Sequence, residues 1–103
     1  MLHVKSTIAL SYRGMHKKVQ VVIIHKSTNQ LLLLRTKVSS GHFWQNVTGS
    51  VEGEESFEVA AIRELKEETC LEGNIINLKL ETEFKDKWDR QVLEKCFLAL
   101  VEN

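Results

Sequence analysis

Glutamates crowd into residues 49–71, and three of them, Glu64, Glu67 and Glu68, recur at helical spacing. Residues three and four positions apart lie on one face of an α-helix, so these carboxylates share a face. Like charges at this spacing destabilise an isolated helix by about 0.2–0.5 kcal/mol per pair. A hard cation such as Mg²⁺ or Mn²⁺ relieves that repulsion because it binds carboxylate oxygens. The segment therefore predicts a metal site, and a solvated acidic helix face is the simpler alternative.

Two further charged residues accompany the acidic face. Glu55 precedes it and Arg63 lies directly before Glu64. A guanidinium group beside several carboxylates can pair with one of them and hold it in a fixed position. We therefore expect Arg63 to organise the cluster.

The remaining composition limits the class of protein. The chain has 103 residues, 43% hydrophobic residues and a formal net charge of zero, which fits one small domain and gives no basic field for nucleic acid. No apolar run is long enough to span a membrane. Cys70 and Cys96 have neither metal-binding nor redox spacing, so we expect two reduced thiols in a cytoplasmic protein.

Hydrophobic patterns predict an α+β domain with a mixed sheet and one central helix. Ser56 is a suitable N-cap for a helix that runs to about Thr69, with an apolar stripe formed by Phe57, Ala61, Ile62 and Leu65. The predicted strands cover residues 19–24, 31–34, 75–84 and 92–101, with a short strand and a turn in residues 43–52.

The first fourteen residues allow two interpretations. They contain a possible edge strand, residues 6–12, or they form a non-native leader before a domain that starts near Met15. The pattern of residues does not choose between them.

The spacing around the acidic helix resembles the Nudix box, G-x5-E-x7-R-E-U-x-E-E-x-G-U, in which U is a bulky aliphatic residue. Eight of its nine defined positions match: Gly49, Glu55, Arg63, Glu64, Leu65, Glu67, Glu68 and Leu71. Cys70 stands where the family has glycine. That position follows the helix, and a left-handed conformation there costs a cysteine about 1 kcal/mol.

This resemblance implies a Nudix-type mixed sheet and a hydrolase that acts on phosphoanhydride bonds with Mg²⁺ or Mn²⁺. Glu64 and Glu68 would be the principal metal ligands, and Glu67 would ligate or orient the attacking water. The carbonyl of Gly49 would add a ligand, while Glu55 and Arg63 would pair and brace the loop and helix.

Residues 43–52, FWQNVTGSVE, resemble the dihydroneopterin triphosphate (dATP) pyrophosphohydrolase subfamily. By this resemblance Arg35 would contact the triphosphate, Thr48 would lie at the substrate, and Lys17 or Lys18 would add a phosphate contact. Trp44 would stack on a flat heterocycle or, as an aromatic residue next to another, belong to the core. The implied reaction yields a monophosphate and pyrophosphate, a step of folate synthesis in bacteria.

Other interpretations stay open at this point. One is a hydrolase for oxidised purine triphosphates, another a Nudix module that binds nucleotide without cleaving it, and a third an acidic helix that docks on a basic partner. Nudix domains usually continue beyond the point that corresponds to Asn103, with a further strand and helix. We therefore expect a C-terminally truncated domain with a bare apolar sheet face, which favours a homodimer.

Overall fold

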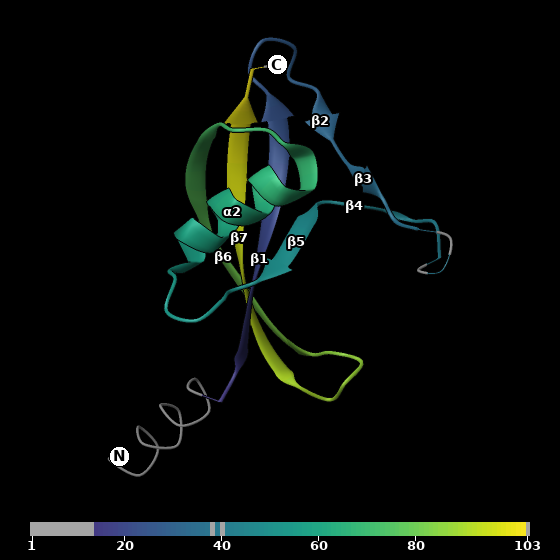
Figure 1. The fold of residues 1–103 in the computed structure, drawn as a ribbon, viewed down its shortest axis with the longest axis vertical. Coiled ribbons are helices and arrows are strands. Elements are labelled where there is room, and N and C mark those ends of the chain that lie inside the picture. Colours follow the sequence, from purple (N-terminus) through teal and green to yellow (C-terminus); the bar gives the residue numbers. More distant parts are fainter. Residues whose placement is uncertain (1–13, 38, 40, 103) are drawn as a thin grey trace.

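A computed structural model describes residues 14–37, 39 and 41–102 of the chain. Its main sheet has five strands, in which β1 (His16–His25) runs parallel to β7 (Gln91–Val101) (Figure 1). β2 (Leu31–Leu32) and β5 (Val47–Ser50) pair antiparallel with β1, and β6 (Asn74–Lys85) pairs antiparallel with β7. The predicted mixed sheet is confirmed. Residues 1–13, which bear on the leader or edge strand, lie outside the described residues.

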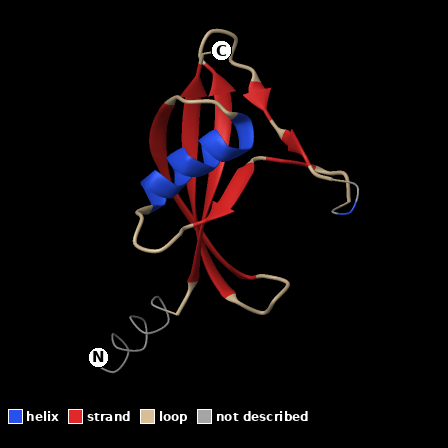
Figure 2. Cartoon of the chain, in the orientation of Figure 1, coloured by secondary structure: helices blue, strands red, loops and turns tan. Residues whose placement is uncertain are grey.

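Two short strands leave the main sheet. β3 (Leu34–Arg35) and β4 (Trp44–Gln45) pair only with each other, and Figure 2 shows them on an arm that extends to one side. The arm lies between β2 and β5 in the chain. The predicted return strand is therefore present but divided into β2, which pairs with β1, and β3 on the arm, and the predicted short strand is divided into β4 and β5.

One helix, α2 (Phe57–Thr69), covers one face of the sheet (Figure 2). Ser56 is its N-cap, as predicted, and its side chain accepts a hydrogen bond from the backbone N–H of Val59. Ala60, Ala61 and Leu65 pack in the core with Val19, Val21, Ile23, Val47 and Phe97. In the described part of the chain, no helix has the length and hydropathy needed to cross a bilayer.

Ile62 does not join the apolar stripe, and that prediction is wrong. Its side chain is 53% exposed. The helix contacts β1 and β5 more than β6, so it lies toward the β5 side of the sheet. Ala60, Ala61 and Leu65 are its buried residues, and Ile62 faces outward.

The other face of the sheet has no helix over it in the described residues (Figure 1). Side chains alternate along each strand, so Val22 and Leu98, which pair across β1 and β7, point away from α2. On the same face, Ile76 is 44% and Leu80 60% exposed. An apolar strip therefore runs across the sheet opposite the helix.

Cys70 ends α2 in the left-handed region, with φ of 61°, and its N–H donates to the Lys66 carbonyl at 2.9 Å. The left-handed conformation predicted for this position is confirmed. A side chain with a β-carbon is strained there, and Cys70 is exposed, so its removal loses no packing.

We expect Cys70→Gly to raise the free energy of unfolding by about 1 kcal/mol in urea denaturation. Cys70→Ser keeps the β-carbon and should give no gain; an equal gain would assign the effect to the thiol.

Candidate active site

Arg63 is the centre of the charged cluster. Its Nη2 donates to Glu55 Oε1 at 2.5 Å and to the Ser50 carbonyl at 2.9 Å. Its Nη1 donates to Glu64 Oε1 at 2.8 Å and to Glu67 Oε2 at 3.1 Å. One guanidinium group thereby ties the loop before α2, the end of β5 and the acidic face of α2 together.

The pairing with Arg63 fixes the charge of Glu55. Hydrogen bonds from the Arg63 side chain and from the Glu52 backbone N–H lower the pKa of the Glu55 carboxyl. The hydrogen bonds that Arg63 itself donates to Glu55 raise the pKa of Arg63 above its already high value. Both groups are therefore ionised at neutral pH, and the predicted Glu55–Arg63 pair is present in the structure.

Gly49 lies against the carboxyl group of Glu64. It pairs with Val19 in the sheet, so its α-carbon faces α2. A β-carbon at this position would collide with the Glu64 carboxyl group. The φ of Gly49 is not in the left-handed region, so glycine is needed here for the close approach of Glu64 and not for backbone conformation. The backbone of β5 and the Glu64 carboxylate are thereby held side by side.

Glu68 has a raised pKa. Burial, a hydrogen bond with Glu64 and the negative charges of Glu64 and Glu67 raise the pKa of Glu68 to about 7. A carboxyl group with a pKa near neutrality suits proton transfer at physiological pH. Its position one helical turn after Glu64 places it on the same side of α2.

The raised pKa of Glu68 predicts a pH-dependent stability of the metal-free protein. The folded state holds this proton more tightly than the unfolded chain, whose pKa is near 4.5. The stabilisation is fully present below that value and is lost as pH rises through about 7. In thermal denaturation with EDTA, we expect the Tm of the wild type to fall between pH 5 and pH 8 by more than the Tm of Glu68→Gln does.

The comparison with the variant is needed because His16 acts in the opposite sense. Burial, followed by the charges of Arg90 and Lys18, lowers the pKa of His16, so its contribution to stability rises with pH. Parallel Tm curves for the two proteins would contradict the prediction for Glu68. Added Mg²⁺ should remove the difference at the high-pH end.

The carboxylates suit a hard divalent cation in donor type. Among the described residues, however, no three His, Cys, Asp or Glu side chains are already gathered as a metal site. Arg63 Nη1 lies between the carboxylates of Glu64 and Glu67. Ligation by Glu64, Glu67 and Glu68 therefore requires Glu64 and Glu67 to turn from Arg63 toward the cation.

Two predicted substrate residues lie on the arm. Arg35 Cζ is 5.9 Å from the centroid of the Trp44 ring. Trp44 is 62% exposed, so the alternative that it belongs to the core is wrong. The exposed ring remains available to a flat heterocycle. Neither side chain takes part in the hydrogen bonds around Arg63.

The other two predicted substrate residues point to the sheet face opposite α2. Thr48 pairs with Gln20, and Lys18 pairs with Ser50. Each is adjacent in sequence to a residue that faces α2, so its own side chain points to the opposite face. Lys17 instead points to the α2 face, with Nζ 5.9 Å from the centroid of the Phe57 ring. Their contact with substrate stays a prediction.

Sequence reasoning missed two partners of Arg63. The Ser50 carbonyl accepts from Nη2, and Glu52 Oε2 lies 3.6 Å from Nη1. Every residue has a backbone carbonyl, so the sequence does not indicate which one accepts a hydrogen bond from Arg63. Glu52 belongs to the acidic run, but its role depends on the turn that brings residues 52–55 back toward the helix.

Two curated proteins with similar sequences are both named dihydroneopterin triphosphate diphosphatase. The chain is 44% identical over 65 residues to dihydroneopterin triphosphate diphosphatase of Haemophilus influenzae. The aligned residues make up 63% of this chain and 40% of that protein. The enzyme of the same name in Escherichia coli K12 is 43% identical over 54 residues, 52% of this chain and 35% of the relative. The matches thus span well under half the length of these curated relatives.

Two solved structures with the same fold are a pyrophosphohydrolase and a hydrolase by name. The E. coli dihydroneopterin triphosphate pyrophosphohydrolase superposes with a TM-score of 0.71 and 28% identity, over 82% of this chain and 66% of that one. A Caenorhabditis elegans Ap4A hydrolase gives 0.67 and 26%, over 86% and 70%. The family profile described as NUDIX domain matches residues 15–102. The chain therefore belongs to the NUDIX domain family.

Proposed function

We propose that this protein is a Mg²⁺-dependent pyrophosphohydrolase that converts dihydroneopterin triphosphate to the monophosphate and pyrophosphate. The observation that carries the proposal is the acidic face of α2, on which Glu64 lies against Gly49 and Arg63 pairs with Glu64, Glu67 and Glu55. The similarity to enzymes named for this substrate supports the choice of pterin. We further propose that the protein acts in the cytoplasm.

Each residue has a proposed task. Glu64, Glu67, Glu68 and the Gly49 carbonyl would hold Mg²⁺ or Mn²⁺, which would neutralise charge on the phosphates and acidify a bound water. Glu67 would also orient the attacking water, and a carboxylate beside that water would take its proton. Arg63 and Glu55 position the helix.

The remaining proposed residues bind the substrate. Arg35 and Lys18 contact phosphate oxygens, and Trp44 stacks on the heterocycle. Thr48, like Lys18, points to the sheet face opposite α2, so both would contact a part of the substrate that reaches around the β5 edge of the sheet.

The test is pyrophosphate release by the 103-residue chain with Mg²⁺ and three substrates: dihydroneopterin triphosphate, dATP and oxidised dGTP. We expect release from dihydroneopterin triphosphate to have the highest kcat/KM. A preference for oxidised dGTP would replace the pterin assignment with a sanitising role. Silence on all three from a folded chain, with nucleotide still bound, would indicate a non-catalytic module.

The exposed strip on the sheet face opposite α2 supports a second copy as partner. Ile76 and Leu80 lie on that strip and expose apolar surface that association would bury. We propose a homodimer, and light scattering is the measurement. A stable, monodisperse monomer over the concentration range of the assay would contradict it.

A further inference from the structure

Three polar side chains form a chain of hydrogen bonds across the sheet face opposite α2. Gln20 on β1 lies between Asn46, which comes directly before β5, and Glu94 on β7. Asn46 Nδ2 is 2.8 Å from Gln20 Oε1, and Gln20 Nε2 is 3.0 Å from Glu94 Oε1. All three residues are half-buried, and no helix lies over this face in the described residues.

The Glu94 carboxylate fixes the direction of both amides in this chain. A carboxylate only accepts hydrogen bonds, so the Gln20 atom that faces it is the NH₂ group. Gln20 Oε1 then faces Asn46, and the Asn46 atom that meets it is also an NH₂ group. Asn46 Oδ1 is thereby turned away from Gln20. It is buried, and no donor among the described residues pairs with it.

A buried acceptor that no protein donor reaches is suited to a ligand N–H. Leaving such an oxygen unpaired is unfavourable, and a ligand that donates to it removes that cost. Trp44 precedes Asn46 by two residues. Two residues of extended chain span at most about 7 Å, so a heterocycle that stacks on Trp44 is close enough to present an N–H to Asn46.

Strand β5 leads from this acceptor to the acidic face of α2. Thr48 pairs with Gln20, so its side chain stands beside the chain of hydrogen bonds. Gly49, the next residue, lies against the Glu64 carboxyl group on the α2 side. In the described residues β5 pairs with β1 alone, so its other edge has no strand partner. A substrate that reaches around this edge can have its ring at Asn46 and its phosphates at the carboxylates.

We infer that Asn46 is a specificity-determining residue whose Oδ1 accepts a hydrogen bond from an N–H of the substrate's heterocycle. Glu94 acts through Gln20 as a positioning residue that presents this oxygen to the ring. The inference rests on the proposed function. It favours heterocycles with an amino or N–H group at the edge, which dihydroneopterin has, over rings that offer only acceptors there.

The test measures ring binding apart from hydrolysis. Equilibrium dialysis with dihydroneopterin, without Mg²⁺, gives the affinity of the ring without phosphates. Asn46→Leu keeps a side chain of similar size, removes the acceptor and should weaken this affinity about tenfold, as expected for one lost hydrogen bond. Asn74→Leu makes the same change at an exposed residue of β6 on the same sheet face and should leave the affinity unchanged.

Glu94→Gln tests the positioning role. Glutamine donates as well as accepts, so the Gln20 and Asn46 amides can turn together and present either oxygen or NH₂ to the ring. The affinity should fall about twofold, because it scales with the fraction of molecules that present the oxygen. With dihydroneopterin triphosphate as substrate, the effect of both variants should appear in KM and not in kcat.

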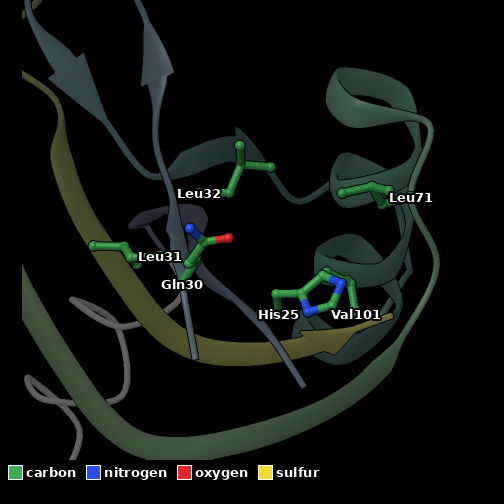
Figure 3. A pocket seen from close by; sticks show the side chains of 6 residues that line it. All are labelled: His25, Gln30, Leu31, Leu32, Leu71 and Val101. Atoms are coloured by element: carbon green, nitrogen blue, oxygen red, sulfur yellow. The ribbon is translucent and has the colours of Figure 1, made fainter. Parts of the chain in front are cut away.

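A pocket at the far end of β1 is the alternative place for the ring. It has a volume of about 490 Å³, and none of the α2 carboxylates lines it. Figure 3 shows Leu32 and Leu71 on two sides of it. His25, which also lines it, is five residues from Gln20, or about 17 Å along the strand. Leu32→Trp fills this pocket and should leave the affinity for dihydroneopterin unchanged.

Each outcome decides the inference. Weaker ring binding confined to Asn46→Leu and Glu94→Gln supports it, and Glu94→Gln alone decides should Asn46→Leu fail to fold. Wild-type affinity in both variants, an equal loss in Leu32→Trp, or a wild type that binds no dihydroneopterin overturns it. Ring binding weakened in Asn46→Leu, in a chain that hydrolyses none of the triphosphates, keeps the role of Asn46 and overturns the proposed function instead.

Discussion

Replacement of Glu68 with glutamine is expected to lower kcat for pyrophosphate release by about 10²–10⁴-fold, with little change in folding. Glutamine keeps the shape of the side chain, but it neither accepts a proton nor contributes negative charge to a cation. Glu68 is exposed and lies beside the negative charges of Glu64 and Glu67, so the neutral amide also relieves repulsion at neutral pH. The measurement is steady-state kinetics together with circular dichroism and urea denaturation.

Glu58→Gln is the matched control for this prediction. Glu58 lies in the first turn of α2, is exposed and takes no part in the Arg63 cluster. It should retain wild-type kcat. Loss of the fold in Glu68→Gln would assign Glu68 a structural role, and unchanged turnover would remove it from catalysis.

Gly49→Ala is expected to lower kcat by about 10²-fold while the sheet stays intact. The added methyl group must displace the carboxyl of Glu64, which is the flexible end of a side chain and can move without unfolding β5. A misplacement of about 1 Å in a catalytic group costs rates of this order. Kinetics and the denaturation midpoint, measured on the same preparation, separate the two effects.

Gly53→Ala is the contrasting control. Gly53 has φ of +50° and open space where a β-carbon would stand. Alanine there should cost about 1 kcal/mol of stability and leave kcat unchanged. Should Gly49→Ala lose stability and keep its activity, the position of Glu64 against β5 would not matter to the reaction.

The strands and the helix follow directly from local patterns in the sequence. Ser56 and Cys70 mark the two ends of α2 because capping depends on nearby backbone groups, which the sequence specifies locally. The alternation of Val19, Val21 and Ile23 fixes which side of β1 faces the core. Arg63 and Glu55 are brought together by the same loop and helix.

Other features depend on long-range packing that spacing does not encode. The apolar stripe predicted through Ile62 is defined only to within one helical position, and the placement of α2 over β1 and β5 decides which positions are buried. The approach of Glu64 to Gly49 depends on the same placement. Trp44 is exposed because β4 pairs with β3 away from the main sheet, which the aromatic composition of its strand does not reveal.

The most direct test of the central claim is a Mg²⁺ titration of pyrophosphate release from dihydroneopterin triphosphate by the wild-type chain. We expect no release in EDTA, a saturable rise with Mg²⁺, and the same dependence with Mn²⁺. Release that is equal with and without the cation, or absent from the folded chain at every Mg²⁺ concentration, would contradict the proposal that the glutamates of α2 hold a catalytic metal.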